Sequence, residues 1–524
     1  MKRFISILLV CLMTFSLFGC GSEDTSAESG QTAGTGSSTT MTAAEKNENE
    51  TLVVSLATEL QTLSILGMQN IVTNQVLTNI YDGLLTLDQE ANICPNIAES
   101  WEWDEENVKY TFHIKQGIKF HDGSELTAKD VAFTFDLIKN EYSDYQATVA
   151  SQVDRTEVID DYTLDVYLTA PSATFLYYCA IYVKVYCEAA WESTNGYTDG
   201  IVACGPYKLV SYDPTTGVEL EAFEDYHGDQ KPVIKHVRFS IIPDPNTQVL
   251  ALQSGELNIS RDFPASTIAT IENDPNLDIY SHNCGMVYFL QFNLRDNTLE
   301  PLKDVKVRQA INYALDKQFM IDVAEEGLGQ PANSVANPDM FGYSDNIPSY
   351  DYNVEKALEL MKEAGYEDGF DIGSIYCREG KDEKIAEIAK ENLAAIGITS
   401  TITLMETNAF LDAMKNGNFY VAATHLNLNT DAAHVFEVCS IRGSVPYSGL
   451  EDPYLEEQRD AQDVEMDSDA RWTMLNDTLV YLSEEAYFAP CYYPEMSYAH
   501  TAGLSFNGYD PFVGMQLRFI EWVD

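Results

Sequence analysis

Two hydrophobic periods, one typical of strands and one typical of helices, alternate along the chain from residue 51 onward. The stretch TLVVSLA (51–57) is short, apolar and rich in β-branched residues, which predicts a buried strand. The stretches 307–324 and 354–366 repeat apolar residues at helical spacing. Residues 384–406 predict a helix, a stop at Gly397 and a strand. Because no internal repeat accompanies this mixture, the sequence predicts a mixed α/β fold.

The first 20 residues, MKRFISILLVCLMTFSLFGC, have the pattern of a secretory signal. A basic start precedes an apolar run, 4–18, that is too short for a stable membrane span. The final LFGC (17–20) resembles the lipobox of bacterial lipoproteins, with the bulky Phe18 as a departure. That resemblance implies an extracytoplasmic protein that is lipid-anchored to the cell membrane through Cys20. An ordinary signal cut nearby is the alternative.

Residues 21–50 consist mainly of Ser, Thr, Gly, Glu, Asn and Gln, which predicts a disordered tether. A coil of that length spans roughly 30 Å root-mean-square. The chain has 31 basic and 82 acidic residues and a formal net charge of −51. This charge argues against nucleic acid as a partner and against polybasic binding to anionic lipid. The simplest interpretation is an acidic surface on an exported protein, with a cationic ligand as the alternative.

Cysteine and histidine spacings predict no metal or cofactor site. Eight cysteines remain besides Cys11 and Cys20, and they show no C-x-x-C and no spacing that names pairs, although one or two disulfides fit the compartment. His425 and His434 are nine residues apart, which does not match a metal site on one helix. We therefore expect no metal and no cofactor.

The segment IKFHDGSELTAKDVAFTFDLIKN (118–140) contains His121 beside an aspartate, which resembles a proton-transfer pair. The dipeptide 122–123, Asp-Gly, is a turn signal, so we expect His121 at the end of a strand. Thr127 and Asp130 have the spacing of a capping box, and apolar residues at i, i+4 and i+7 from Val131 give the following helix a buried face. The structural interpretation is therefore preferred over the catalytic one.

The longer segment WEWDEENVKYTFHIKQGIKFHDGSELTAKDVAFTFDLI (101–138) resembles the signature of the family 5 extracytoplasmic solute-binding proteins. This family includes dipeptide-, oligopeptide- and nickel-binding components of ABC importers. Three further blocks agree in order: CGPYKLVSYDPTTGVELEAFEDYHGDQ from Cys204, FLQFNLRDNTLEPLKDVKVRQAINYALDK from Phe289, and APCYYPE (489–495). The resemblance covers about residues 51–524.

The resemblance implies a type II periplasmic-binding-protein-like α/β fold, with two lobes, a hinge and an extra subdomain inserted in lobe I. The hinge is expected near Gly285–Asn293 and Pro494–Gly503. The lobes would close on a small solute and present it to ABC permease subunits, and we expect a monomer. The implied boundaries are 51–90, 201–290 and 501–524 for the lobe I core, 91–200 for the inserted subdomain, and 291–500 for lobe II.

In peptide-binding members, a W-x-A-D block supplies the aspartate that pairs with the α-ammonium of the peptide. Aligned with that block, FYVAATHLNLNTDAAHVF (419–436) has Leu426 at the tryptophan position and Asn429 at the aspartate position. Since a buried ammonium needs a charged partner, either Asp431 takes over this role or the ligand lacks a free ammonium there. A register error of one or two residues is the third alternative.

The predicted ligand-binding residues combine amides, charged groups and aromatic rings: His425, Asn427, Asn429, Asp431, Tyr447, Tyr492, Tyr493, Tyr376 and Arg378. Such groups suit a peptide backbone, and the rings could also stack on sugars. A peptide is favoured and an oligosaccharide is the alternative.

Two rival functions are an exported hydrolase and a sensor lipoprotein. The sequence has no G-x-S-x-G, H-E-x-x-H, P-loop or G-x-G-x-x-G motif, although a glycosidase needs only two carboxylates. The four ordered blocks favour a binding protein that is not an enzyme. A sensor would share the fold.

Overall fold

The computed structural model describes residues 41–64, 66, 71–88, 92–141, 146–197, 200–261, 263–427, 431–440, 442–443, 447–506, 509–510 and 514–524. Within this part of the chain, Thr42–Asp524 forms one compact unit. The predicted signal and the predicted lipid anchor at Cys20 lie outside the described residues. No described helix is long and apolar enough to cross a bilayer.

The largest described sheet contains 12 strands. They are β1 (Thr51–Leu56), β8 (Tyr207–Asp213), β9 (Gly217–Ala222), β10 (His236–Ile241), β11 (Ile259–Ser260), β12 (Leu277–Asn283), β13 (Met286–Phe292), β14 (Gly329–Pro331), β15 (Phe370–Cys377), β16 (Ile398–Leu404), β17 (Val421–Asn427) and β18 (Phe488–Thr501). The order is β16-β15-β17-β13-β18-β11-β1-β10-β9-β8, and β12 and β14 also pair with β18. β15 is parallel to β16 and β17, as the predicted mixed α/β fold allows.

A second sheet has the order β4-β5-β7-β6, from strands β4 (Ala98–Asp104), β5 (Lys109–Ile114), β6 (Val153–Asp160) and β7 (Thr163–Leu168). Short two-stranded sheets pair β2 (Leu85–Leu87) with β3 (Ile93–Pro95), β19 (Leu504–Phe506) with β22 (Ile520–Trp522), and β20 (Tyr509–Asp510) with β21 (Gly514–Met515).

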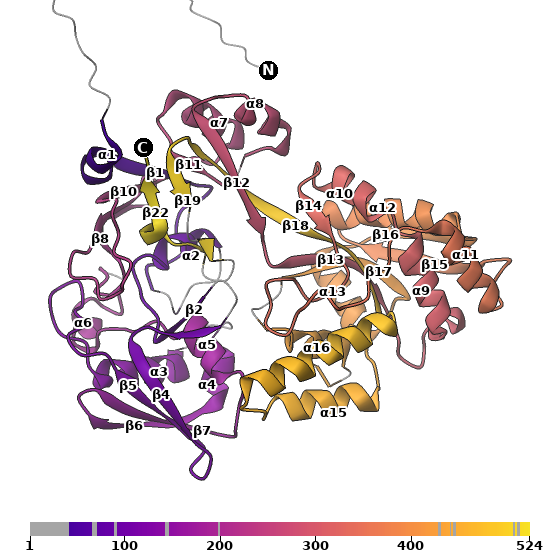
Figure 1. Cartoon of the computed structure of the whole chain (residues 1–524), viewed down its shortest axis with the longest axis horizontal. Helices are drawn as coiled ribbons and strands as arrows, with labels where there is room; N and C mark the ends of the chain where they lie inside the picture. The colour runs from indigo at the N-terminus through magenta and orange to yellow at the C-terminus, as the bar shows by residue number, and fades with distance from the viewer. Residues whose placement is uncertain are drawn as a thin grey trace, which may run out of the picture. The chain divides into compact units, whose positions relative to one another are not determined.

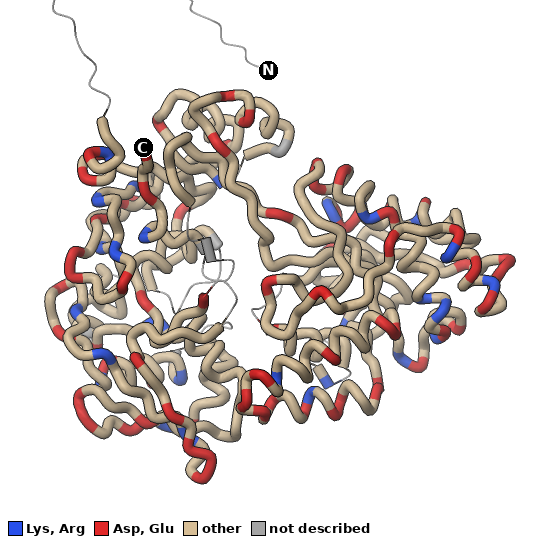
Figure 2. The backbone as a smooth tube through the Cα atoms, in the orientation of Figure 1, with Lys and Arg blue, Asp and Glu red and all other residues tan. Residues whose placement is uncertain are grey.

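Helices cover these sheets (Figure 1). Their bounds are α1 (Ala43–Asn49), α2 (Ile71–Leu77), α3 (Ala128–Glu141), α4 (Ala147–Gln152), α5 (Phe175–Tyr182), α6 (Glu188–Ser193), α7 (Pro245–Ser254), α8 (Ile268–Glu272), α9 (Val305–Ala314), α10 (Lys317–Ala324), α11 (Val354–Glu363), α12 (Lys381–Ala394), α13 (Thr407–Asn416), α14 (His434–Cys439), α15 (Pro453–Gln462) and α16 (Ser468–Glu484). Figure 2 shows Asp and Glu distributed over most helices and loops of the described chain.

The long strand β18 changes partners along its length. Its first half pairs with β13, at Phe488 to Tyr492, and its second half pairs with β12, at Glu495 to Thr501 (Figure 1). Between β12 and β13 lies Gly285, whose φ of 70° is in the left-handed region that glycine tolerates. The exchange of partners therefore lies at the start of the two segments predicted as the hinge.

The segment 118–140 forms the turn and the capped helix that its sequence predicts. The carboxylate of Asp130 accepts a hydrogen bond from the backbone N–H of Thr127 at 2.9 Å, at the start of α3. Val131, Phe135 and Ile138 are buried in the core. These contacts confirm the predicted turn and helix, whereas the strand expected before His121 is only an isolated bridge between Lys119 and Glu125.

We expect His121→Ala to leave solute affinity unchanged within threefold and to flatten the pH dependence of stability. The imidazole Nε2 lies 3.0 Å from the Gly205 carbonyl oxygen, and Nδ1 is buried without a hydrogen-bond partner. Desolvation lowers the pKa of His121 from 6.5 to about 4. The unfolded chain therefore binds the extra proton first, so stability is lost as the pH falls from 6.5 to 4, by up to about 1.4 kcal/mol per pH unit.

Urea unfolding of both proteins between pH 4 and 7 measures this difference. Equal pH slopes for the variant and the parent would contradict the assignment, and so would a loss of affinity without unfolding.

The helix predicted over 307–324 is in fact two helices, α9 and α10. The break lies at Leu315 and Asp316, and the Asp316 carboxylate caps α10 by accepting a hydrogen bond from Phe319 N at 3.0 Å. The apolar period continues across the break because both helices pack against the same cluster, which contains Ile311 and Met320. The period alone therefore could not reveal the cap.

The predicted tether, 21–50, is wrong over its last residues, because Ala43–Asn49 form α1. Thr42 and Glu45 make a reciprocal capping box at its start. Asn47 then accepts a hydrogen bond from Trp522 N at 2.9 Å and donates one to the Trp522 carbonyl at 3.2 Å. A polar sequence thus becomes ordered through contacts with the carboxy-terminal strand, which no local pattern indicates.

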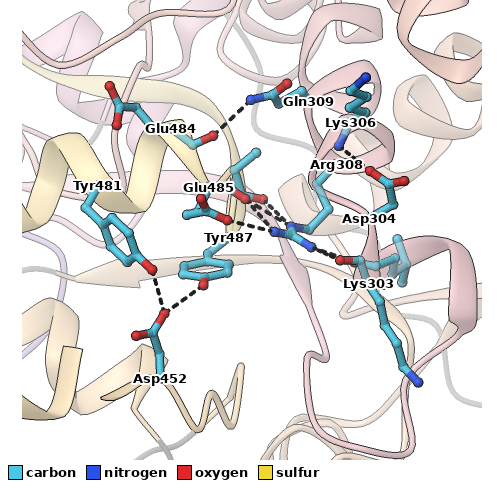
Figure 3. A network of polar contacts seen from close by, with 12 residues as sticks. Lys303, Asp304, Lys306, Arg308, Gln309, Asp452, Tyr481, Glu484, Glu485 and Tyr487 are labelled. Carbon is cyan, nitrogen blue, oxygen red and sulfur yellow. Dashed lines mark hydrogen bonds and ion pairs between the residues drawn. The ribbon is translucent and has the colours of Figure 1, made fainter. Parts of the chain in front are cut away.

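Arg308 of α9 is 4% exposed and joins elements that are distant in sequence (Figure 3). Its Nε donates to the carbonyl oxygens of Glu485 and Ala486 at 3.0 and 3.2 Å, and its Nη2 donates to Glu485 O at 2.7 Å. Its Nη1 donates to the Leu302 and Lys303 carbonyls at 2.9 and 3.0 Å. The guanidinium thus satisfies carbonyl groups just beyond α16, where a cation is also favourable.

The cysteines form no disulfide within the described residues. Burial raises the pKa of the Cys439 and Cys491 thiols to about 12, so they stay protonated. The one or two disulfides that the compartment allows are therefore not part of this structure.

Candidate functional site

Three elements meet at one edge of the main sheet. β15 and β17 are parallel neighbours, so their carboxyl ends lie at the same edge, and α12 begins shortly after β15 ends. Arg378 directly follows β15, and His425 lies near the end of β17. Ligands of open α/β sheets bind outside the carboxyl ends of the strands. The edge is therefore the candidate site.

Asp382 of α12 joins the two predicted residues at this edge. Its Oδ2 accepts a hydrogen bond from Arg378 Nε at 2.7 Å, and its Oδ1 lies 2.9 Å from His425 Nδ1. The guanidinium also donates to Thr424 Oγ1 at 3.3 Å and lies 5.0 Å from the Phe410 ring. The Asp382 side chain is 3% exposed, whereas that of Arg378 is 20% exposed. A buried carboxylate thus fixes a guanidinium that reaches the surface.

A second ion pair lies beside the first. Glu325 Oε2 accepts from Lys381 Nζ at 2.6 Å, and Oε1 accepts from the Tyr492 hydroxyl at 3.0 Å. The Tyr492 ring stacks on Tyr288 at 4.9 Å, and Tyr288 lies 5.0 Å from the His425 ring. Burial raises the pKa of the Tyr492 hydroxyl well above its usual range. We call this set the Arg378 cluster: Tyr288, Glu325, Arg378, Lys381, Asp382, His425 and Tyr492.

The other predicted aromatic residues divide into two groups. Tyr376 and Tyr447 are half-buried against the small core around Phe410, and burial raises the pKa of Tyr447 while Arg378 opposes the shift. Tyr493 is 3% exposed, and its hydroxyl donates to the Ser334 and Ala336 carbonyls at 2.9 and 2.8 Å. The first group thus borders the Arg378 cluster, whereas Tyr493 holds a loop.

Two predicted amides cannot be placed in the same way. Asn427 pairs with Met286 in the β13–β17 ladder, but its side chain lies outside the described residues. Asn429 also lies outside them. Their roles stay predictions.

Asp431 is engaged in a buried ion pair. Its two carboxylate oxygens lie 2.6 and 3.0 Å from Nη1 and Nη2 of Arg471. The Arg471 side chain is 2% exposed, and two more of its N–H groups donate to Gln462 at 3.2 and 2.8 Å. Asp431 Oδ1 also accepts from Ala433 N at 2.9 Å. Four of the five guanidinium N–H groups and both carboxylate oxygens thus have hydrogen-bond partners within the protein.

A cavity of about 200 Å³ lies between α4 and α5 on one side and α14 and α15 on the other. Ala173 N donates to Asp463 O at 2.9 Å, and the Tyr177 ring lies 5.5 Å from Phe341. The predicted inserted subdomain therefore contacts the later half of the chain. The side chains around the cavity belong to Thr148, Gln152, Thr174, Tyr177, Tyr178, Asp431, Ala433, His434, Phe436, Glu437, Arg459, Gln462 and Asp463.

Sequence reasoning found Arg378 and His425 but missed Asp382, the acidic residue that contacts both. Asp382 follows Arg378 by four residues at a helix start, and this spacing could have indicated it. Glu325 and Arg471 have no such local signal. No group of three or more His, Cys, Asp or Glu in the described part of the chain is placed to hold a metal ion.

Known proteins resemble this chain in sequence and in fold. Residues 92–436 match the model of the bacterial extracellular solute-binding proteins, family 5. The dipeptide-binding protein of Escherichia coli K12 is 30% identical over 355 residues, which are 62% of this chain and 66% of that protein. The heme-binding protein A of Haemophilus influenzae is 28% identical over 419 residues, 74% of this chain and 76% of that protein.

The fold also matches a solved structure of this kind. HbpA2 from Haemophilus parasuis aligns with a TM-score of 0.82 at 23% identity, over 90% of this chain and 99% of that chain. This likeness shows the two-lobed type II periplasmic-binding-protein fold predicted from the sequence. The chain belongs to family 5 of the bacterial extracellular solute-binding proteins.

Proposed function

We propose that this chain is the membrane-tethered substrate-binding lipoprotein of an ABC importer. It captures a peptide or a peptide-like solute between its lobes and delivers it to the permease. Family membership and the similarity to a dipeptide-binding protein support this function. The observation that carries the proposal is the Arg378 cluster at the carboxyl edge of the sheet, where two basic side chains reach the surface.

The cluster supplies directed donors to a solute carboxylate. Arg378 and Lys381 lie three residues apart at the start of α12, and a guanidinium binds carboxylates strongly because its fork matches both oxygens. Asp382 and Glu325 fix these side chains before a solute arrives, which reduces the entropy lost on binding. The His425 side chain, which is 27% exposed, lies beside them and packs against the buried Tyr288 ring at 5.0 Å. A peptide carboxyl end fits this arrangement.

The proposed lobes are residues 291–500 for lobe II and the remaining folded segments for lobe I. We propose that these two lobes close on the solute. A solute that touches both lobes binds the closed form more tightly than the open form, so it shifts the population toward closure. The permease would recognise the closed form. A non-peptide solute such as an oligosaccharide stays the second candidate, because Tyr447 is half-buried and aromatic rings of this kind stack on sugars.

We expect Arg378→Gln to weaken peptide binding about tenfold to a hundredfold, because a hydrogen bond to a charged group contributes about 1.5–3 kcal/mol. Titration calorimetry with di- to hexapeptides measures the change, after a thermal-shift screen has identified binders. Arg442→Gln is the matched control, since Arg442 is 52% exposed and pairs with Glu456 and Asp460. Equal affinities for parent and Arg378→Gln would refute the assigned role, and the absence of any peptide binder would refute the peptide assignment.

A further inference from the structure

Charge is distributed unevenly between the buried and the exposed parts of the Arg378 cluster. The carboxylates are buried, with 3% of the Asp382 side chain and 6% of the Glu325 side chain exposed. Their basic partners are more exposed, at 20% for Arg378, 27% for His425 and 48% for Lys381. The cluster therefore presents donors and positive charge to a solute, and it keeps its negative charge behind them.

The stretch that follows β17 adds no available negative charge. Between His425 and Phe436, Asp431 is the only acidic residue in the sequence. Both of its carboxylate oxygens are bonded to Arg471 at 2.6 and 3.0 Å, and the two side chains are 9% and 2% exposed. Phe341 fixes the pair from a third segment, because its backbone bridges to residue 431 and its ring lies 5.6 Å from the guanidinium.

Arg471 already neutralises the charge of Asp431, so this carboxylate is not an available counterion for a solute ammonium while the pair is intact. If the pair separated, Arg471 would be a buried cation that keeps only its bonds to the Gln462 oxygens and its contact with the Phe341 ring, and such a charge is strongly destabilising. A solute ammonium placed here would face the same penalty, since a buried charge needs an available counterion. Of the three alternatives that the sequence left open, the first would require this separation, so the geometry favours the second over the first.

We infer that the solute is a carboxylate that carries no free ammonium at this site, such as an amino-blocked peptide. This inference rests on the proposed function and names its substrate class. Its carboxylate would bind Arg378 and Lys381, and its other end would gain no counterion from Asp431, which is paired with Arg471.

The test is calorimetric titration of the purified protein, without its signal segment, against a random tripeptide library in four forms. The forms are free, amino-acetylated, carboxyl-amidated, and blocked at both ends. We expect acetylation to change the apparent Kd less than threefold and amidation to raise it at least tenfold. In Arg378→Gln, the effect of amidation should fall below threefold, which links the preference to this side chain.

A double variant, Asp431→Asn with Arg471→Gln, checks the other half of the inference. It removes both charges of the pair. Thermal denaturation first shows whether the variant is folded. In the folded variant, the ratio of the affinities for acetylated and free tripeptides should stay within threefold of the ratio in the parent protein. A single Asp431→Glu variant provides a second measurement if the double variant does not fold.

The outcomes separate the inference from the proposed function. If acetylation weakens binding at least tenfold, the inference is overturned, but the proposed function as a peptide-binding protein of an importer is not. A loss of free-tripeptide binding in the double variant overturns it as well. If no form of the library binds at millimolar concentration, both the inference and the peptide assignment fail.

Discussion

Replacement of Arg471 by methionine is expected to lower the free energy of unfolding by about 3–5 kcal/mol. The variant leaves the Asp431 carboxylate buried, and it removes contacts of 2.6 and 3.0 Å to that carboxylate and two hydrogen bonds to Gln462. Removal of the cation lowers the free energy of unfolding by more than the intact pair adds to it, because the desolvation of the buried carboxylate is no longer offset. Urea unfolding followed by circular dichroism measures the loss.

Arg442→Met is the matched control for this prediction. Arg442 also contacts carboxylates, those of Glu456 and Asp460 at 2.8 Å, but its side chain is 52% exposed. Exposed pairs contribute about 0–1 kcal/mol, so this variant should unfold close to the parent. A second variant, Asp431→Leu with Arg471→Met, should recover most of the loss, since apolar replacement of a whole buried pair is often neutral. A loss below 1 kcal/mol in Arg471→Met would show that the pair is not buried in solution.

The second large effect is expected for Arg308→Lys, which should lower the free energy of unfolding by about 3 kcal/mol. Lysine keeps the charge but lacks the planar fork that reaches four carbonyl groups (Figure 3). The carbonyls of Glu485 and Leu302 would then lose buried donors. Contact of the guanidinium with the Tyr487 ring, at 5.1 Å, is lost as well.

The same unfolding assay applies to Arg308→Lys. Lys306→Ala is the control. Lys306 lies two residues before Arg308 on α9, and its ammonium pairs with Glu363 on an exposed surface, where the two side chains are 45% and 55% exposed. We expect less than about 0.5 kcal/mol for that variant. Equal losses for the two variants would mean that charge, rather than the fork, supports this region.

The sequence predicted those parts of the fold that short-range patterns determine. Thr127 and Asp130 are three residues apart, and a capping box needs no information from elsewhere. The break at Asp316 was missed because its cap competes with an apolar period that continues through it. Helix α1 was missed because its stability comes from Trp522, at the other end of the chain.

In the candidate site, too, the sequence indicates residues with a local signal and misses those whose contacts are long-range. Arg378 could be named because polar residues that follow strands are expected at a ligand edge, and His425 because it lies in the block 419–436 that is compared with the ligand-binding block of peptide-binding members. Glu325, the partner of Lys381 and Tyr492, comes from the end of a helix that packs against β18, and Arg471 lies 40 residues from Asp431. Such pairings depend on tertiary structure, so the sequence left the role of Asp431 open. The structure resolves the geometry of that carboxylate, whereas Asn429 stays a prediction.

The exchange of partners along β18 has a mechanical consequence. Pro494 lacks an N–H group, Gly285 accepts left-handed torsions, and at residue 494 the described backbone of β18 pairs with the three-residue β14 instead of β12 or β13. In the closure that we propose, bending at this point would rotate a few torsions and leave the ladders with β12 and β13 intact. Closure would then store little elastic energy, and most of the free energy gained from a bound solute would be available to discriminate one solute from another.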